Sequence, residues 1–277
     1  MRPLLASTFR NPYSIQSSTA LNDEQLFKVV PSVFAAEKHE SRSDKYLYIP
    51  TIDILHGLKK EGFEPFFACQ CRTRTPGRHN HTKHMLRLRH ASQEIDKSSD
   101  TNEIILLNSH DGTSSYQMMA GRFRFVCSNG MIRGDITSDI RTPHKGNVLH
   151  NIIEGAYTIL DNFSEIDETV DGFKSISLNS DEKRAYARAA LELKYDDGKA
   201  PIEADDLLRT RRFEDRGDNS IWNTFNVVQE NVIRGGLHGK TRAGKNTTTR
   251  EVGGIDGNVK LNRALWVLAD ELKRLKA

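Results

Sequence analysis

The spacing of apolar residues changes part-way along the chain, and this change constrains the fold more than any other feature of the sequence. Between residues 63 and 133 the side chains alternate with a period of two, which is typical of half-buried strands. From about residue 145 onward, apolar residues recur at spacings of three and four, which is typical of amphipathic helices. A run of strands followed by a run of helices favours an α+β fold over an alternating α/β fold.

The first region is predicted to form an antiparallel sheet. Its strands are Phe63–Arg74, His84–Ala91, Glu103–Asn108, Ser114–Met119 and Arg122–Ser128. The last two are predicted to form a hairpin around Ala120 and Gly121. A short strand, Lys45–Pro50, and a short helix, Asp23–Val30, precede the sheet.

The remaining periodic segments are predicted to be helices. They are Ile52–Glu61, Gly146–Phe163, Ser180–Leu193, Ser220–Arg234 and Asn258–Lys276. The predicted fold class is therefore α+β, with a central antiparallel sheet, a long helix packed on it and a helical C-terminal part. We expect two regions, residues 1–144 with an N-terminal arm and the sheet, and residues 145–277 with the helices and a basic glycine-rich loop at 235–254.

Positive charge is concentrated in two windows, residues 68–91 and 231–250, and neither contains Asp or Glu. The formal net charge of the whole chain is only +3, so the charge is segregated rather than high. Segregated positive charge indicates a surface for a polyanion, most often nucleic acid. The residues predicted to bind nucleic acid are Arg72, Arg74, Arg78, Lys83, Arg87, Arg89, Lys240, Arg242, Lys245 and Arg250.

The arginines of the first window are spaced by two along predicted strands. Arg72 and Arg74 would share one face of their strand, as would Arg87 and Arg89. If the two strands pair, four guanidinium groups line one face of the sheet, where they could bind phosphates bidentately. The alternative is a solvated face that balances the acidic run Asp161–Asp171. The second window is interpreted either as a clamp that orders on DNA or RNA or as a disordered linker.

A metal site in the first window is a weaker hypothesis. The candidate ligands are Cys69, Cys71, His79, His81 and His84. Cysteine and histidine are ligands that zinc prefers, but this spacing does not match the common zinc sites. We therefore predict no metal and no cofactor, and keep a metal-dependent enzyme as an alternative function.

No catalytic residue is predicted elsewhere in the chain. The run Ser109-His110-Asp111 places triad residue types next to one another, whereas a triad is recognised by its geometry rather than by adjacency. Cys127 follows an apolar run, where a cysteine is usually inert. The protein is accordingly predicted to be a binding protein rather than an enzyme.

Cysteine usage and hydropathy bear on location. Three cysteines are an odd number for a disulfide scaffold and indicate thiols in a reducing cytosol. No apolar stretch approaches about 18 residues, so no membrane partner is expected. The predicted location is the cytoplasm.

Several strings of the sequence carry a family resemblance. They include PSVFAAEKHESRSDKYLYIPT (Pro31–Thr51), FEPFFACQCRTR (Phe63–Arg74), EIILLNSHDGTSSYQM (Glu103–Met118), VIRGGLHGK (Val232–Lys240) and GIDGNVKLNRALWVLADEL (Gly254–Leu272). Together they resemble the YfjQ/YafZ/YubP group of enterobacterial prophage and plasmid proteins, part of a larger phage- and plasmid-borne family of unknown function. The resemblance implies a bacterial mobile element as the setting and implies no catalytic residue.

The leading functional prediction is nucleic-acid binding, to DNA rather than RNA, by a protein of a plasmid or prophage. The order of strands followed by a long helix is similar to that of phage single-strand annealing recombinases, which suggests single-strand DNA binding or annealing in a homo-oligomer. Two alternatives remain. One is an anti-defence or host-takeover protein that binds a host protein, and the other is the metal-dependent enzyme.

Overall fold

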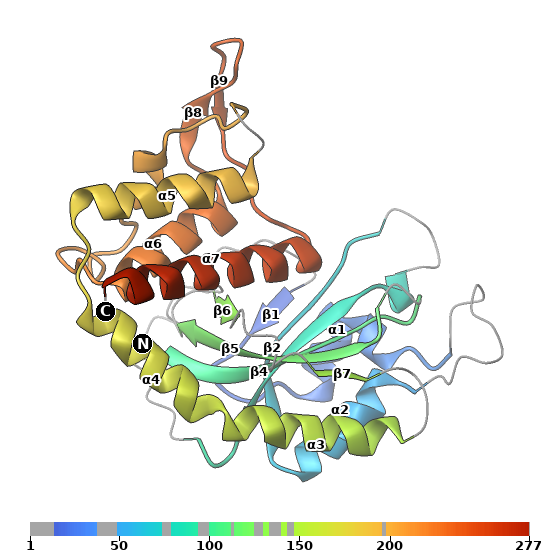
Figure 1. Cartoon of the computed structure of the whole chain (residues 1–277). Coiled ribbons are helices and arrows are strands. Elements are labelled where there is room, and N and C mark those ends of the chain that lie inside the picture. Colours follow the sequence, from blue (N-terminus) through green and yellow to red (C-terminus); the bar gives the residue numbers. More distant parts are fainter. Residues whose placement is uncertain are drawn as a thin grey trace, which may run out of the picture. The chain divides into compact units, whose positions relative to one another are not determined.

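The computed structural model describes residues 14–37, 49–73, 79–93, 100–111, 114–124, 130–132, 140–142, 147–195 and 198–276 (Figure 1). The chain divides into two compact units. Unit 1 comprises Met1–Gly130 and Ile136–Phe163, and unit 2 comprises Met131–Asp135 and Ser164–Ala277. Strands followed by helices make the fold α+β, as the sequence predicted.

Unit 1 contains the sheet except for Met131 and Ile132, which are grouped with unit 2. The strands of the sheet are β1 (Ser14–Gln16), β2 (Phe63–Gln70), β3 (His84–His90), β4 (Asp100–Asn108), β5 (Tyr116–Arg124), β6 (Gly130–Ile132) and β7 (Ile140–Thr142). The strand order is β1-β2-β3-β4-β5-β6, and β7 also pairs with β5. The pairs β1–β2, β2–β3, β3–β4, β4–β5 and β5–β7 are antiparallel.

The predicted hairpin around Ala120 and Gly121 is wrong. Both residues lie inside β5, which pairs with β4 along its length. Gly121 lies directly opposite Glu103 in this pairing. The glycine therefore belongs to a paired strand and not to a turn.

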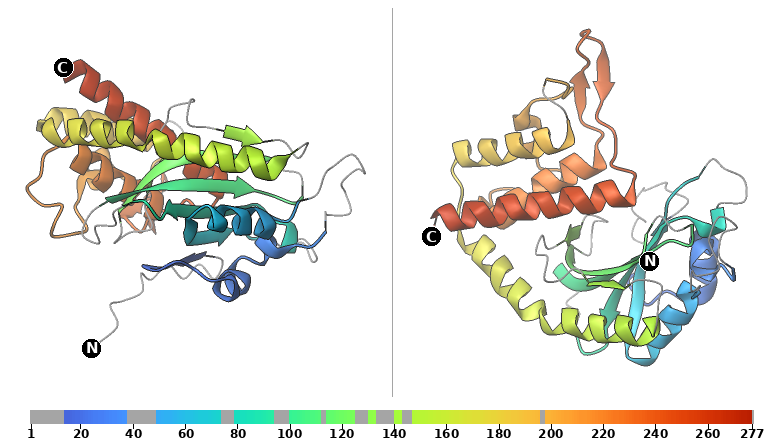
Figure 2. Two further views of the ribbon diagram at one scale, coloured as in Figure 1. Left: turned by 90° about the horizontal axis from the view of Figure 1, so that it is seen from below. Right: turned by 45° about the vertical axis from the view of Figure 1, so that its right-hand side comes forward.

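The helices of unit 1 cover one face of the sheet. They are α1 (Asp23–Val29), α2 (Thr51–Lys60) and α3 (Val148–Asp161), with the short 3-10 turns η1 (Pro31–Phe34) and η2 (His79–His81). The predicted long helix across the sheet is α3 (Figure 2). Gly155 lets α3 approach the sheet, because a Cβ at this position would lie 2.5 Å from Met118 Cε. Since α3 packs on β5 and β7, unit 1 extends to Phe163 rather than to the expected residue 144.

Unit 2 is a helical unit with one small hairpin. Its elements are α4 (Phe163–Ser175), α5 (Ser180–Lys194), η4 (Ala204–Leu208), α6 (Ile221–Arg234), β8 (His238–Lys240), β9 (Asn246–Thr248) and α7 (Ile255–Lys276). Helix α6 is buried on every side from Ile221 to Ile233, so it is the centre of this unit. The rings of Phe173 and Trp266 pack α4 against α7, with centroids 5.0 Å apart. Helix α4 was not predicted.

The predicted glycine-rich loop contains an ordered hairpin. Strands β8 and β9 pair antiparallel in the register His238↔Thr248, Gly239↔Thr247 and Lys240↔Asn246. The turn of the hairpin closes with Thr241 N donating to Lys245 O, and Gly244 adopts a φ of +76°. A three-residue hairpin loop needs such a left-handed residue, and glycine supplies it without strain.

Across the parts of the chain that the structure describes, no helix is both long and apolar enough to cross a bilayer.

A candidate nucleic-acid interface

The arginines of β3 are buried, so the prediction that Arg87 and Arg89 face solvent is wrong. Their exposures are 2% and 3%, and Glu103 of β4 is completely buried between them. Arg87 Nε donates to Glu103 Oε2 at 2.5 Å, and Arg89 Nε donates to Glu103 Oε1 at 2.7 Å. The physical reason is that β3 is a central strand whose two faces are both buried, so its alternation of arginine and leucine does not separate a wet face from a dry one.

Aromatic rings complete this ion-pair cluster. The guanidinium carbon of Arg87 lies 3.4 Å from the ring centroid of Phe123, and that of Arg89 lies 4.3 Å from Phe66. Arg87 also lies 4.7 Å from Phe67, next to Phe66 at a register shift in β2. A guanidinium over an aromatic face is stabilised by the ring quadrupole. Some of the phenylalanines that could have stacked bases therefore stack arginines.

The other basic residues of the first window do not complete the predicted surface. Arg72 is exposed and Lys83 is half-buried, while Arg74 and Arg78 lie outside the described residues. The four-guanidinium face is therefore not formed, because two of its members pair internally with Glu103.

The cysteine and histidine candidates show structural roles. The described ranges contain no group of three or more His, Cys, Asp or Glu placed to hold a metal ion. Burial, reinforced by Cys71, raises the pKa of the Cys69 thiol to about 12, so it stays protonated. Burial also lowers the pKa of His84 to about 4, and His84 Nε2 lies 2.9 Å from Thr51 Oγ1.

In the Ser109-His110-Asp111 run, Ser109 and His110 are completely buried, whereas Asp111 is half-buried. Ser109 Oγ accepts a hydrogen bond from Ser114 N at 2.8 Å, as a turn residue does. His110 Nε2 lies 3.1 Å from the hydroxyl of Thr51, which also accepts from Asn108 Nδ2 at 3.0 Å. Thr51 thus joins α2 to β4 and the turn after it. Cys127 lies outside the described residues.

The second window differs, because it forms an arm that is fixed at its base. We call residues 236–250 the basic arm. At its base, Gly235 has a φ of +66°, and a Cβ there would lie 2.6 Å from the backbone carbon of Arg250. Lys194 Nζ donates to Val232 O at 2.5 Å and to Arg250 O at 2.7 Å, and burial lowers the pKa of this amine to about 8. These contacts fix both ends of the arm.

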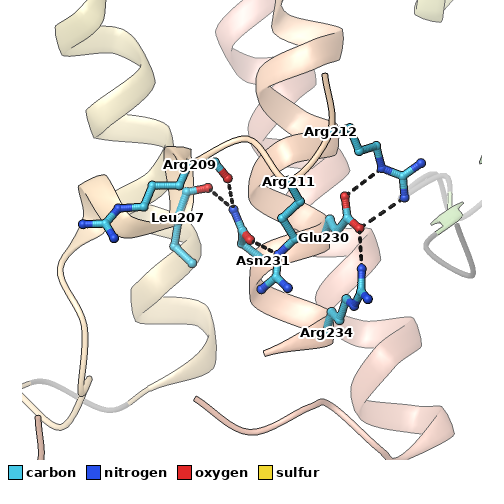
Figure 3. A network of polar contacts seen from close by, with 7 residues as sticks. All are labelled: Leu207, Arg209, Arg211, Arg212, Glu230, Asn231 and Arg234. Carbon is cyan, nitrogen blue, oxygen red and sulfur yellow. Dashed lines mark hydrogen bonds and ion pairs between the residues drawn. The ribbon is translucent and has the colours of Figure 1, made fainter. Parts of the chain in front are cut away.

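A polar network beside the base contains the acid Glu230 (Figure 3). Glu230 of α6 accepts from Arg212 Nε at 3.1 Å and from Arg234 at 3.2 Å. Burial alone raises the pKa of the Glu230 carboxyl, but the two arginines outweigh this and hold its pKa below the ordinary value. Arg211 donates to Asn231 Oδ1 and to Gly235 O, both at 2.5 Å. Glu230 therefore balances residues at the base and not those along the arm.

The cations of the arm remain exposed. Lys240, Arg242, Lys245 and Arg250 all have exposed side chains. Within the described residues, none of these four side chains forms an ion pair or a hydrogen bond. The residues of the second window that were predicted to bind nucleic acid therefore form an exposed positive surface on a hairpin whose base is fixed.

Residues 38–266 match the family described as "Domain of unknown function (DUF932)". The chain belongs to this family. It is 50% identical over 268 residues to the "UPF0380 protein YafZ" of Escherichia coli (strain K12), covering 97% of each chain. It is also 50% identical over 268 residues to the "UPF0380 protein YfjQ" of the same strain, again covering 97% of each. No solved structure matches the chain. The DUF932 match includes both basic windows and the whole basic arm.

The residues that position the arm were missed by sequence reasoning. Lys194 and Arg211 lie well before the arm in the sequence and give no local signal. In the sequence, nothing distinguishes Gly239 from the other glycines of the loop, although a Cβ at this position would clash with Pro201 O. The Gly235-Gly236 pair was the one available signal, since adjacent glycines after a helix predict left-handed backbone.

Proposed function

We propose that this protein binds nucleic acid through the basic arm. The observation that carries the proposal is the row of exposed cations, Lys240, Arg242 and Lys245, on a hairpin whose base is fixed. Each phosphate that such a cation neutralises releases condensed counterions, so the affinity falls with salt. A fixed base lowers the conformational entropy that binding would otherwise cost.

The composition of the arm favours a polyanion over an acidic protein surface. The arm contains no Phe, Tyr or Trp, and its one large apolar residue, Leu237, is half-buried. Protein interfaces depend on buried aromatic or apolar anchors, whereas phosphate recognition needs only placed cations. The predicted host-protein alternative therefore receives less support from this surface.

The buried arginines of β3 restrict how the single-strand annealing hypothesis can work. Strands β3, β4 and β5 followed by α3 give the order that suggested it. However, Arg87 and Arg89 are paired with Glu103, so the proposal rests on the arm and not on the sheet. A cytoplasmic location, a plasmid or prophage setting and a homo-oligomer complete the proposal, as the resemblance and the sequence imply.

A binding titration tests the proposal. Fluorescence anisotropy would follow the full-length protein with single- and double-stranded DNA and RNA at 50 and 200 mM salt. We expect salt-dependent binding that is lost in a variant with Lys240→Ala, Arg242→Ala and Lys245→Ala. A charge-matched control with Lys60→Ala, Arg188→Ala and Lys260→Ala, all exposed helix positions, should keep most of the affinity. Equal losses in both variants, or no binding to any probe at 50 mM salt, would refute the proposal.

A further inference from the structure

The two faces of the hairpin in the basic arm differ. Cross-strand neighbours share a face, so the pairs His238–Thr248 and Lys240–Asn246 lie on one face. All four of these residues are exposed. Gly239 and Thr247 form the other face and are half-buried. We call the first the open face.

The second face is covered by the segment before η4. Lys240 N donates to Pro201 O at 2.8 Å, and a Cβ on Gly239 would lie 2.8 Å from Ile202 Cγ2. Gly239 is thus the close-approach site for Pro201 and Ile202. The cover lies on one side only, and Figure 1 shows the hairpin extending away from α5 and α6. The open face is therefore presented outward from unit 2.

The side chains of the open face are of a particular kind. They are an amide, a hydroxyl, an imidazole and an ammonium, and within the described residues none has a hydrogen-bond partner. Asn bonds the N6 and N7 edge of adenine, Lys bonds O6 and N7 of guanine, and Thr contacts the methyl group of thymine. A surface that served only to attract phosphate would need cations alone.

The dimensions of the hairpin suit a groove. Backbone pairing extends from the Gly236–Thr249 contact to the Thr241–Lys245 contact. At about 3.3 Å per residue, the paired length is about 17 Å. The major groove of B-form DNA is about 12 Å wide and about 8.5 Å deep and admits a two-stranded ribbon, whereas the major groove of duplex RNA is too narrow.

We propose that the open face of the basic arm reads base edges in the major groove of duplex DNA, while Arg242 and Lys245 at the turn contact the flanking phosphates. This inference rests on the proposed function and makes it specific. The arm has no aromatic residue on which unpaired bases could stack, which disfavours a single strand as its ligand. Pro201 and Ile202 hold the hairpin on its covered side, and the open face is left to meet the groove.

Selection from a randomised duplex tests the inference. The full-length protein would be incubated with a library of 20-base-pair DNA duplexes, and the bound fraction would be sequenced. We expect enrichment of a short motif. Asn246→Ala should relax one position of that motif, lowering discrimination there by about 5- to 100-fold. The pair Arg242→Ala and Lys245→Ala should weaken binding to all sequences alike and leave the motif unchanged.

Two neighbouring threonines provide the matched control. Thr248→Ala removes a hydroxyl from the open face and should alter the motif, while Thr247→Ala on the covered face should not. Duplex binding without any enriched motif would overturn this inference and leave the proposed function standing. Tighter binding to a single strand than to the duplex of the same sequence would also overturn this inference and leave the proposed function standing. Absence of binding to every probe at low salt would overturn both.

Discussion

Residues 68–91 and residues 231–250 are both rich in basic residues and free of Asp and Glu. Their described cations differ in burial, because key arginines of the first are buried and those of the second are exposed. In the first window, Arg87 and Arg89 are buried on Glu103 and stacked on phenylalanine rings. In the second, Lys240, Arg242 and Lys245 extend into solvent from a fixed hairpin. The β3 arginines of the first window are therefore part of a core, and the cations of the second lie on a surface.

A stretch of sequence without acids can still be surrounded by acids in the folded protein. Glu103 lies 14 residues after Arg89 in the sequence but on the neighbouring strand of the sheet. A sheet brings such residues within hydrogen-bonding distance, and the pairing decides whether an arginine is available to a ligand. Among the strands that the structure describes, only β8 and β9 pair in the arm, because they form a two-stranded sheet by themselves.

The largest expected effect comes from removing the acid of the first window. Glu103→Gln leaves two guanidinium groups buried without their counter-charge, and breaking a buried pair in this way costs about 3–5 kcal/mol. Amide hydrogen exchange at β3 and β4 is the measurement, because Trp222 and Trp266 both lie in unit 2 and do not report on the sheet. We expect exchange in these strands to accelerate by more than about 100-fold.

An exposed acid of the same unit provides the control. Glu24 is 77% exposed and pairs with Lys28 at 2.6 Å, so Glu24→Gln should cost less than about 1 kcal/mol. Equal effects of the two substitutions would mean that the Glu103 pair is not a core interaction, and the contrast between the windows would fail.

The pH dependence of unit 1 is the next largest effect. Burial holds the pKa of His84 at about 4, below the unfolded value of about 6.5, so the unfolded chain binds a proton first as the pH falls. The contribution of neutral His84 to the unfolding free energy is fully present above pH 6.5. It falls by up to about 3 kcal/mol as the pH decreases from 6.5 to 4. Urea unfolding followed by β3 amide exchange would measure it. His84→Gln should flatten the pH dependence in this range, and an unchanged slope would contradict the assignment.

Two adjacent glycines test whether close packing fixes the base of the arm. In Gly235→Ala, a residue with a Cβ must adopt left-handed backbone and clash with Arg250. We expect this to lower the unfolding free energy of unit 2 by about 2 kcal/mol. Gly236 has a φ of +78°, but a Cβ there would meet no atom within 4 Å, so Gly236→Ala should cost only about 1 kcal/mol. Tryptophan fluorescence during urea unfolding reports both. A larger loss at Gly236 would show that the base is not fixed by close packing.

The smallest expected effect on stability is at the turn of the arm. Arg242 is exposed without a described partner, so Arg242→Ala should change the unfolding free energy of unit 2 by less than about 0.5 kcal/mol. The same substitution should weaken nucleic-acid binding and lower the slope of log K against log salt by about 0.9 for duplex DNA. A stability loss above about 1 kcal/mol would place Arg242 in a structural role, like Arg87.

Local patterns predicted most elements, and long-range contacts account for the failures. The bounds of α6, Ile221–Arg234, nearly match the predicted helix Ser220–Arg234, and the structure adds a cap in which the Ser220 hydroxyl accepts from Asn223 N at 3.0 Å. The Ala120–Gly121 turn was wrong, because pairing with Glu103 overrides the local preference of glycine. For the site, composition located the arm cations, but the burial of Arg87 and the positioning role of Lys194 depend on partners distant in sequence.

The most direct test of the contrast between the windows is a hydrogen-exchange map of the full-length protein with and without bound duplex DNA. We expect DNA to slow exchange at amides 237–249 and to leave exchange in β3, residues 84–90, unchanged. Slower exchange in β3 with an unaffected arm would contradict it, because the sheet would then be the surface that meets the nucleic acid.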